Sequence, residues 1–237
     1  MSNSNLPRFR LALRSVLAVA IAMAASSFVV MRFSRMKLAA LPSAAVPNPV
    51  TDVSLTPASG QQTAIFSGGC FWGMAAIFEH VKGVSAVVAG YSGGSATTAH
   101  YEQVSAGGTG HAESIQITYD PTQVSYGQLL KVFFSVAHDP TQLNRQGNDV
   151  GTQYRSDIFY TNEQQAQTAK AYIKQLNQAH VFNQPIVTQV NPLTAFYAAE
   201  DYHQNYVDRN PDNAYVVSVE LPKVEQFRNS FPDLYKP

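Results

Sequence analysis

The sequence predicts an α+β domain whose core is a ferredoxin-like split βαβ sandwich, carrying an additional helix, strand and long functional loops. Two observations support this fold class. Segments with strand or helix periodicity follow one another as strand, helix, strand, strand, helix, strand, and then a further helix and strand, which is the order of a split βαβ unit with additions. The composition, with 45% hydrophobic and 14% charged residues, is typical of a chain that folds around a core.

The first strand and helix flank a glycine-rich turn. The apolar run at 63–66 predicts a short buried strand. After Cys70, apolar side chains recur at i, i+3, i+4 and i+7, the spacing of one helix face. We therefore expect Cys70 at the N-terminus of this helix. The apolar face comprises Met74, Ile77, Phe78 and Val81.

Two strands and a second helix follow. A strand is predicted at 84–91, and the alternation of polar and apolar residues at 114–119 predicts a half-buried strand. The second helix is expected at about 126–137, because Ser125 and Gln128 have the spacing of a capping box at its start.

The last predicted elements are a strand at 158–160, a helix at 162–179 and a strand at 186–190. Polar segments of low periodicity separate the regular elements, and functional residues are often placed on such loops. The three segments are 92–113, 138–155 and 191–213.

The amino-terminal part of the chain differs from the rest in charge and hydropathy. Every charged residue before Asp52 is basic, so residues 38–237 carry ten basic and sixteen acidic side chains, a net charge of −6. This balance gives no nucleic-acid-binding footprint. Residues 15–31 form an uncharged, mostly apolar stretch between two arginines, which is typical of an export signal or a membrane attachment.

The sequence therefore divides into three parts. Residues 1–38 are expected to be a signal peptide or membrane anchor, residues 39–60 a proline-rich linker, and residues 61–237 the folded domain. The expected location is the cell envelope, on the periplasmic side, either exported or anchored. The alternative is a cytoplasmic protein with a spurious N-terminal extension. We expect the domain to be a monomer.

Cys70 is the only cysteine of the chain, so it has no internal disulfide partner. Two glycines precede it and two aromatic residues follow it, at the turn between the first strand and the first helix. Free backbone amides and the helix dipole at such a position favour an anion, which predicts a lowered pKa of the thiol. The alternative interpretation is a small buried hydrophobic residue.

Further side chains able to take part in chemistry gather in the three loops. They are Tyr101, His111 and Glu113 in the first loop, Asp149 and Tyr154 in the second, and His203 in the third. The His-x-Glu spacing of His111 and Glu113 also occurs in zinc deaminases, but the paired cysteines of that signature are missing here. We therefore expect no metal site.

Four motifs resemble the signature blocks of the A-type peptide methionine sulfoxide reductases, and they occur in the order of that family. They are Gly69–Gly73, Gly110–Glu113, Gly147–Arg155 and Glu200–Gln204. The similarity extends over about 63–235, so residues 61–237 would be a methionine sulfoxide reductase catalytic domain.

The resemblance implies that the domain reduces the S-epimer of methionine sulfoxide, free or in oxidised proteins, without a metal or bound cofactor. Cys70 would attack the sulfoxide sulfur and become a sulfenic acid. Glu113, Tyr101 and Tyr154 are expected around the oxygen, Phe71 and Trp72 against the S-methyl group, and Asp149 and His203 in less direct contact with the substrate. A carboxyl beside apolar rings keeps its proton through desolvation, as an acid for the oxygen requires.

The sequence departs from many members of that family at two points. It has no resolving cysteine, so an external thiol such as thioredoxin, glutaredoxin or glutathione must reduce the sulfenic acid. Ala75 stands where an acidic residue is common, and this change is expected to alter the electrostatics of the site without removing the activity.

Two other functions are open at this point. A cysteine hydrolase would need a histidine base beside Cys70, and the candidates are His111, His138 and His203. A hydrolase would turn over without a reductant. A binding module for oxidised methionine would keep the site but would form no methionine in a single turnover.

Overall fold

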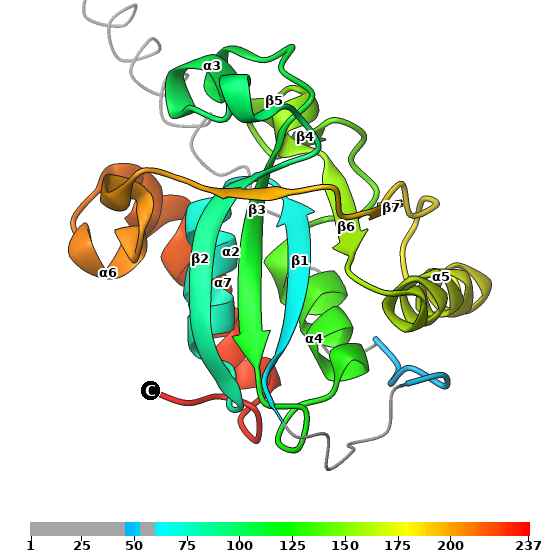
Figure 1. Ribbon diagram of the computed structural model, residues 1–237. Coiled ribbons are helices and arrows are strands. Elements are labelled where there is room, and N and C mark those ends of the chain that lie inside the picture. The colour runs from blue at the N-terminus through cyan, green and yellow to red at the C-terminus, as the bar shows by residue number, and fades with distance from the viewer. Residues whose placement is uncertain (1–45, 53–59) are drawn as a thin grey trace, which may run out of the picture. The chain divides into compact units, whose positions relative to one another are not determined.

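A six-stranded sheet in the order β7-β6-β1-β3-β2-β8 forms the centre of the computed structural model, which describes residues 46–52 and 60–237. Figure 1 shows the central strands side by side, with helices behind them. A second, two-stranded sheet consists of β4 (Arg145–Gln146) and β5 (Asp149–Val150). The strands of the large sheet are β1 (Gln62–Gly68), β2 (Val84–Ser92), β3 (Ala112–Tyr119), β6 (Ser156–Tyr160), β7 (Gln189–Pro192) and β8 (Phe196–Ala198).

Neighbouring strands are antiparallel except for β6 and β7, which are parallel. A parallel pair needs a long crossover connection, and helix α5 (Glu163–Gln178) supplies it. The α+β class predicted from the sequence is confirmed.

The remaining helices are short, and three of them cover one face of the sheet. In Figure 1, α2, α4 and α7 lie behind the central strands, and α2 packs against both β2 and α7. The bounds are α2 (Phe71–Glu79), α3 (Tyr101–Ala106), α4 (Tyr126–Val132), α6 (Tyr206–Arg209) and α7 (Leu221–Ser230). π-helical turns at Phe133–Ala137 and Val216–Glu220 and 3₁₀ turns at Ala96–Thr98, Thr152–Tyr154 and Asp201–His203 complete the set within the described residues.

Aromatic side chains fill the core between the sheet and these helices. The ring of Phe66 on β1 lies 4.9 Å from that of Phe133 and 5.8 Å from that of Phe78, measured between centroids. All three side chains are fully buried. Burial of each stabilises the fold by about 1.5–3 kcal/mol, so this cluster fixes α2 and the π-helical turn after α4 against β1.

Most predicted elements occur where the sequence placed them. The capping box of Ser125 and Gln128 is present, with each side chain bonded to the other residue's backbone amide. The predicted helix 126–137 is α4 followed by a π-helical turn.

The C-terminal third differs from the prediction. The strand expected at 186–190 is β7, which begins only at Gln189, and β8 and α6 lie inside a segment expected to be a loop. Pairing with β2 gives β8 its strand geometry. A tertiary contact of this kind leaves no periodic pattern in the local sequence.

Residues 46–52, which belong to the expected linker, are packed on the domain. The Tyr172 hydroxyl donates a 2.7 Å hydrogen bond to the Pro47 carbonyl. Asp52 accepts hydrogen bonds from the Ser125 hydroxyl and the Gly127 amide. This part of the chain is therefore a strap over α4 and α5 and not a free tether.

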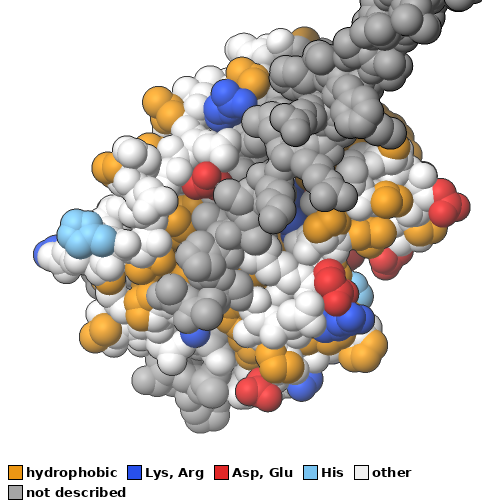
Figure 2. Space-filling model, turned by 180° about the vertical axis from the view of Figure 1, so that it is seen from behind, with side chains coloured by type: hydrophobic (Ala, Val, Ile, Leu, Met, Phe, Trp, Pro, Cys, Tyr) orange, Lys and Arg blue, Asp and Glu red, His pale blue; other side chains and the backbone are white. Residues whose placement is uncertain are grey.

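The expected anchor, residues 15–31, lies outside the described residues. No helix within the described ranges is long and apolar enough to cross a membrane. On the face shown in Figure 2, basic and acidic side chains are scattered among apolar and uncharged ones.

Candidate active site

Cys70 lies in the tight turn between β1 and α2 and occupies the N-cap position of that helix. The turn depends on Gly69, whose φ of 92° is in the region that favours glycine. A Cβ at this position would lie 2.7 Å from the Gln146 side chain. The thiol is half-buried at the helix N-terminus, as predicted from the sequence.

Glu113 lies beside this turn because β1 and β3 are antiparallel, so the end of one strand meets the start of the other. Its side chain is only 3% exposed. The Phe71 amide, in the first turn of α2, donates a 3.0 Å hydrogen bond to Oε2 of Glu113. The carboxyl group is thus held at the helix N-terminus that also carries Cys70.

Burial raises the pKa of Glu113 to about 8, although the hydrogen bond from Phe71 acts in the opposite direction. The carboxyl is therefore largely protonated near neutral pH. This agrees with the expectation that a carboxyl beside aromatic rings would remain an acid.

Two tyrosines approach the same place from different elements. Tyr101 begins α3, and its amide donates a 3.0 Å hydrogen bond to Glu200. Tyr154 ends the 3₁₀ turn at 152–154, and Gln153 ties this turn to α3 through a 2.9 Å bond to the Ser105 carbonyl. Burial is the main cause that raises the pKa of both phenols, so they remain hydroxyl donors.

These groups enclose a cavity of about 110 Å³. Seven of its eight lining residues are among those predicted from the sequence. The exception is Tyr215, whose hydroxyl donates a 2.7 Å hydrogen bond to Asp149 and so holds that carboxylate at the cavity wall. The lining residues are Cys70, Phe71, Trp72, Tyr101, Glu113, Asp149, Tyr154 and Tyr215.

An aromatic wall closes one side of the cavity. Phe71 is 1% exposed, and Trp72 stacks on Tyr206 of α6, which belongs to the third of the predicted loop segments, 191–213. The indole N–H donates a 3.0 Å hydrogen bond to Nδ1 of His203. His203 thus lies behind the wall and orients Trp72, but it does not line the cavity itself.

The predicted lowering of the Cys70 pKa is wrong. Burial raises the pKa of the thiol well above its ordinary value, and the nearby Glu113 and Glu220 raise it further. The Trp72 amide and Lys223 act in the opposite direction without outweighing burial. The helix terminus was correctly placed, but desolvation of the sulfur outweighs the helix dipole.

Residues 62–234 match the family model of the peptide methionine sulfoxide reductases. The chain belongs to this family. A peptide methionine sulfoxide reductase of Synechocystis sp., designated MsrA 2, is 53% identical over 218 residues, which cover 91% of this chain and 98% of the relative. One from Mesorhizobium japonicum is 56% identical over 75% of this chain and 91% of its own.

Solved structures agree with this assignment. Methionine sulfoxide reductase A of Corynebacterium diphtheriae superposes with a TM-score of 0.56 at 37% identity, over 70% of this chain and 84% of that one. Reduced Mxr1 of Saccharomyces cerevisiae gives a TM-score of 0.58 at 31% identity, over 69% and 92%. The fold is that of the reductase family, and the activity is peptide-methionine (S)-S-oxide reduction.

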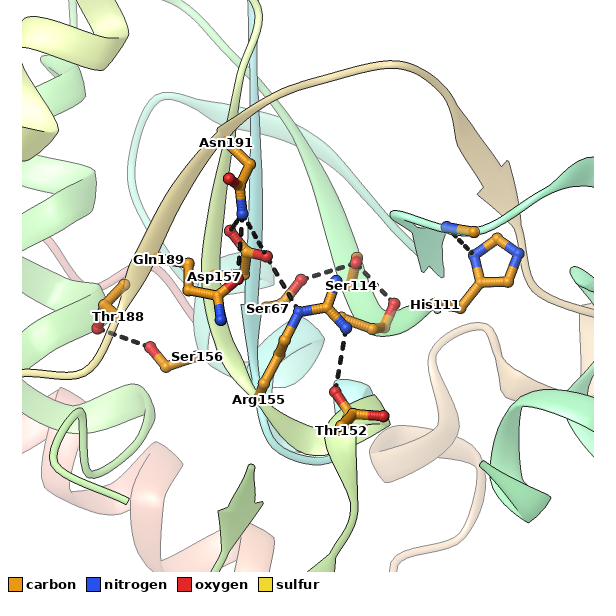
Figure 3. A network of polar contacts seen from close by, with 12 residues as sticks. Ser67, His111, Ser114, Thr152, Arg155, Ser156, Asp157, Thr188, Gln189 and Asn191 are labelled. Carbon is orange, nitrogen blue, oxygen red and sulfur yellow. Dashed lines mark hydrogen bonds and ion pairs between the residues drawn. The ribbon is translucent and has the colours of Figure 1, made fainter. Parts of the chain in front are cut away.

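A polar network around the fully buried Asp157 supports one tyrosine of the reductase. Arg155 forms an ion pair with Asp157, N to O 3.1 Å, and also donates to the Thr152 carbonyl. Asn191 of β7 donates to both oxygens of Asp157. Figure 3 shows this chain of contacts running from β7 to the 3₁₀ turn at 152–154 that presents Tyr154.

The three histidines considered as hydrolase bases are bonded to other groups. His111 contacts the Gly94 amide and the Ser95 carbonyl, and His203 accepts from Trp72. His138 is buried between the Phe133 carbonyl and the Ser156 hydroxyl, and its burial lowers its pKa to about 4. In the described part of the reductase no base–thiol pair joins a histidine to Cys70.

Ala75 is 4% exposed and packs in the main core. An acidic side chain at this position would therefore have to be accommodated in a buried place.

Within the residues that the structure describes, no group of three or more His, Cys, Asp or Glu side chains is arranged to hold a metal ion.

Proposed function

We propose that Cys70 is the nucleophile of the reductase and Glu113 the acid that protonates the departing oxygen. The observation that carries this assignment is the shared cavity, which brings a thiol, a carboxyl with a raised pKa and two phenols together. Nucleophilic sulfur and an acid within one small, partly apolar site are what sulfoxide reduction requires.

The reaction begins when the Cys70 thiolate attacks the sulfoxide sulfur. Glu113 gives its proton to the oxygen, and the hydroxyls of Tyr101 and Tyr154 donate hydrogen bonds to it as negative charge builds up. The protonated oxygen then passes to the sulfur of Cys70: its bond to the substrate sulfur and the bond between the two sulfurs break, and an S–O bond to Cys70 forms. Two electrons pass from the Cys70 sulfur to the substrate. Thiolate, proton and sulfoxide thus become a sulfenic acid and a thioether.

The aromatic wall selects the group beside the reacting sulfur. Phe71 and Trp72 form an apolar surface against which the S-methyl group packs, while the phenols and Glu113 occupy the polar side of the cavity. This division favours one configuration at sulfur. Asp149, held by Tyr215, faces the substrate backbone, and His203 acts through Trp72.

The sulfenic acid must be reduced by a thiol from outside the chain, because Cys70 is the only cysteine. A first thiolate attacks the sulfur of the sulfenic acid, giving a mixed disulfide and water, and a second thiol releases Cys70 as a thiol. Thioredoxin, glutaredoxin and glutathione have the required chemistry.

A single-turnover assay tests these roles. The full chain, without reductant, is mixed with the separated S and R epimers of methionine sulfoxide, and Cys70→Ser is the control. We expect close to one equivalent of methionine from the S-epimer alone, together with a dimedone adduct on Cys70. If neither epimer gives methionine, the assignment fails and a hydrolase or a binding module replaces it.

We also propose that the chain is exported or anchored in the cell envelope through residues 15–31. The similarity to the Synechocystis relative covers more of the chain than residues 61–237 can supply, which supports an N-terminal part that belongs to the protein. Cell fractionation with N-terminal sequencing tests this location. A full-length protein in the cytoplasm would contradict it and favour a spurious extension.

The finer fold assignment is a ferredoxin-like split βαβ core. It is supported by the order β6-β1-β3-β2 with antiparallel neighbours and by α2 and α4 on one face. We further propose a monomer, which sedimentation equilibrium of the purified chain tests.

A further inference from the structure

The C-terminal segment places a buried ion pair under the first turn of α2. Glu220 ends the π-helical turn at 216–220, and its Oε2 lies 2.8 Å from Nζ of Lys223 in α7. The Glu220 side chain is fully buried, and that of Lys223 is 15% exposed. A buried charge pair is expensive to desolvate, so its position suggests a functional role.

Gly73 leaves room for this pair. A Cβ at position 73 would lie only 1.7 Å from Oε2 of Glu220, so no other residue fits there without displacing the carboxylate. Gly73 is one helical turn after Cys70, at the N3 position of α2. The carboxylate therefore rests directly against the turn that presents the thiol.

One oxygen of Glu220 has no partner. Oε1 is buried and accepts no hydrogen bond within the described residues, and it too faces Gly73, 3.1 Å from where a Cβ of that residue would lie. An unsatisfied buried carboxylate oxygen is costly, because its lost hydration is not replaced. A purely structural ion pair would gain stability by satisfying it.

The charged and titratable groups around Cys70 come from several elements. Glu113 lies on β3 and is largely protonated below about pH 8. The phenols of Tyr101, Tyr154 and Tyr215 remain neutral because their pKa values are raised. Asp149 on β5 is bonded to Tyr215. The Glu220–Lys223 pair thus supplies one negative and one positive charge near the thiol while Glu113 is neutral.

We propose that the Glu220–Lys223 pair sets the ionisation of Cys70, with Lys223 stabilising the thiolate and Glu220 holding the ammonium group in place. Both are positioning residues, and the role rests on the proposed nucleophile. The two charges act on the sulfur in opposite directions: Glu220 raises the pKa of the thiol and Lys223 lowers it. Burial keeps the resting thiol protonated, and the pair provides a cation when the thiol loses its proton.

Alkylation by iodoacetamide tests this proposal without using the reductase reaction. Only the thiolate reacts, and the chain has no other cysteine, so the rate at each pH reports the ionisation of Cys70. The full chain is compared with Lys223→Met, Glu220→Gln and the double variant. Glu225→Gln and Arg228→Met are matched controls, because that exposed ion pair lies on the same helix.

We expect Lys223→Met to slow alkylation at pH 7 by about threefold or more, and Glu220→Gln to accelerate it by a similar factor. The double variant should return towards the wild-type rate, and the control pair should leave it unchanged. The single-turnover rate against pH should shift with the alkylation profile.

Opposite shifts separate an electrostatic role from loss of structure, since a damaged site would change both variants in the same direction. If both variants alkylate like wild type, or shift together, the proposal is overturned. Lys223→Arg, which keeps the charge, must restore the wild-type profile if Lys223→Met folds poorly. Normal alkylation shifts without any sulfoxide reduction would instead contradict the proposed catalytic function.

Discussion

Trp72 stacks face to face on Tyr206, with ring centroids 3.7 Å apart and planes inclined by 6°. The indole N–H is held at the same time by Nδ1 of His203. Burial lowers the pKa of His203, which keeps the ring neutral and able to accept this bond at neutral pH. The aromatic wall is therefore fixed from behind by two residues outside the cavity lining.

Replacing Tyr206 by alanine should loosen this wall without touching the reacting groups. We expect the KM for methionine sulfoxide to rise by about three- to tenfold, because an aromatic pair contributes about 0.5–1.5 kcal/mol beyond its buried area. The kcat should change less. Steady-state kinetics with dithiothreitol as the reducing thiol measure both quantities. Tyr206→Phe keeps the stacked ring and should behave like wild type; an equal loss in the two variants would contradict the role of stacking.

Glu113→Gln should slow the single turnover by about 100-fold or more, the usual contribution of a positioned acid. The amide oxygen still accepts the hydrogen bond from Phe71, so the geometry of the turn is kept. In the wild type, the reaction needs the protonated acid together with the thiolate. Because the pKa of Cys70 is raised well above its ordinary value, the thiolate fraction keeps increasing with pH, while Glu113 loses its proton above about 8. The two effects cancel, so the rate should rise up to about pH 8 and then level off, whereas in Glu113→Gln it should go on rising. Rapid-quench measurements from pH 6 to 10 test this change of slope, and a wild-type rate that climbs above pH 8 as steeply as below it would exclude Glu113 as the acid.

The same substitution should stabilise the fold at alkaline pH. Between its ordinary value of 4.5 and about 8, the buried carboxyl binds a proton that the unfolded chain releases, so stability falls as the pH rises through this window. Glu113→Gln removes this loss, which amounts to at most about 5 kcal/mol. The variant should melt like the wild type at pH 4.5 and at a higher temperature at pH 9. Melting temperatures that differ equally at both pH values would contradict this account.

Local signals in the sequence were sufficient to find most of the cavity. Glycines around Cys70 mark a turn, and the strand pattern places Glu113 at the start of β3, so antiparallel pairing brings the two together. Tyr206, Tyr215 and Glu220 reach the site only through the folding of the C-terminal segment. No spacing in the sequence encodes such long-range contacts.

Some signals were present but were not used. Pro222 lies in the first turn of α7, where proline is favoured, and it could have located this helix. To predict that the pKa of Cys70 is raised, one must know that the sulfur is buried, and neither composition nor periodicity gives this information. Residues 46–52 pack on the domain through individual hydrogen bonds to α4 and α5. A proline-rich composition does not predict such bonds.

The network behind Tyr154 should be sensitive to the loss of its cation. Arg155→Met leaves the fully buried Asp157 carboxylate with Asn191 as its remaining side-chain partner, and removing one member of a buried pair costs about 3–5 kcal/mol. The Thr152 carbonyl also loses its side-chain donor and keeps only the backbone amide of residue 155, so the turn carrying Tyr154 should loosen and the single-turnover rate should fall. Urea unfolding and rapid-quench kinetics measure the two effects.

Arg155→Met is best compared with Arg228→Met, which removes an exposed ion pair and should cost less than about 1 kcal/mol. Double substitution with Asp157→Asn removes the uncompensated charge and should recover part of the stability. A wild-type rate in Arg155→Met would show that the network does not position Tyr154.

Asp52 stabilises the opposite end of the domain from the cavity. It accepts from the Ser125 hydroxyl over 2.5 Å and from the Gly127 amide over 2.8 Å, both in the first turn of α4, whereas Glu113 lies at the far end of β3. Asp52→Ala removes both bonds and should lower the free energy of unfolding by about 1–2 kcal/mol, with single-turnover kinetics unchanged. Val50→Ser is the matched control in the same strap, because that side chain is 86% exposed. Thermal melts decide the outcome, because a loss of 1 kcal/mol lowers the melting temperature of a domain of this size by about 2–4 °C. If Asp52→Ala melts at the same temperature as the control, residues 46–52 rest on α4 without stabilising it.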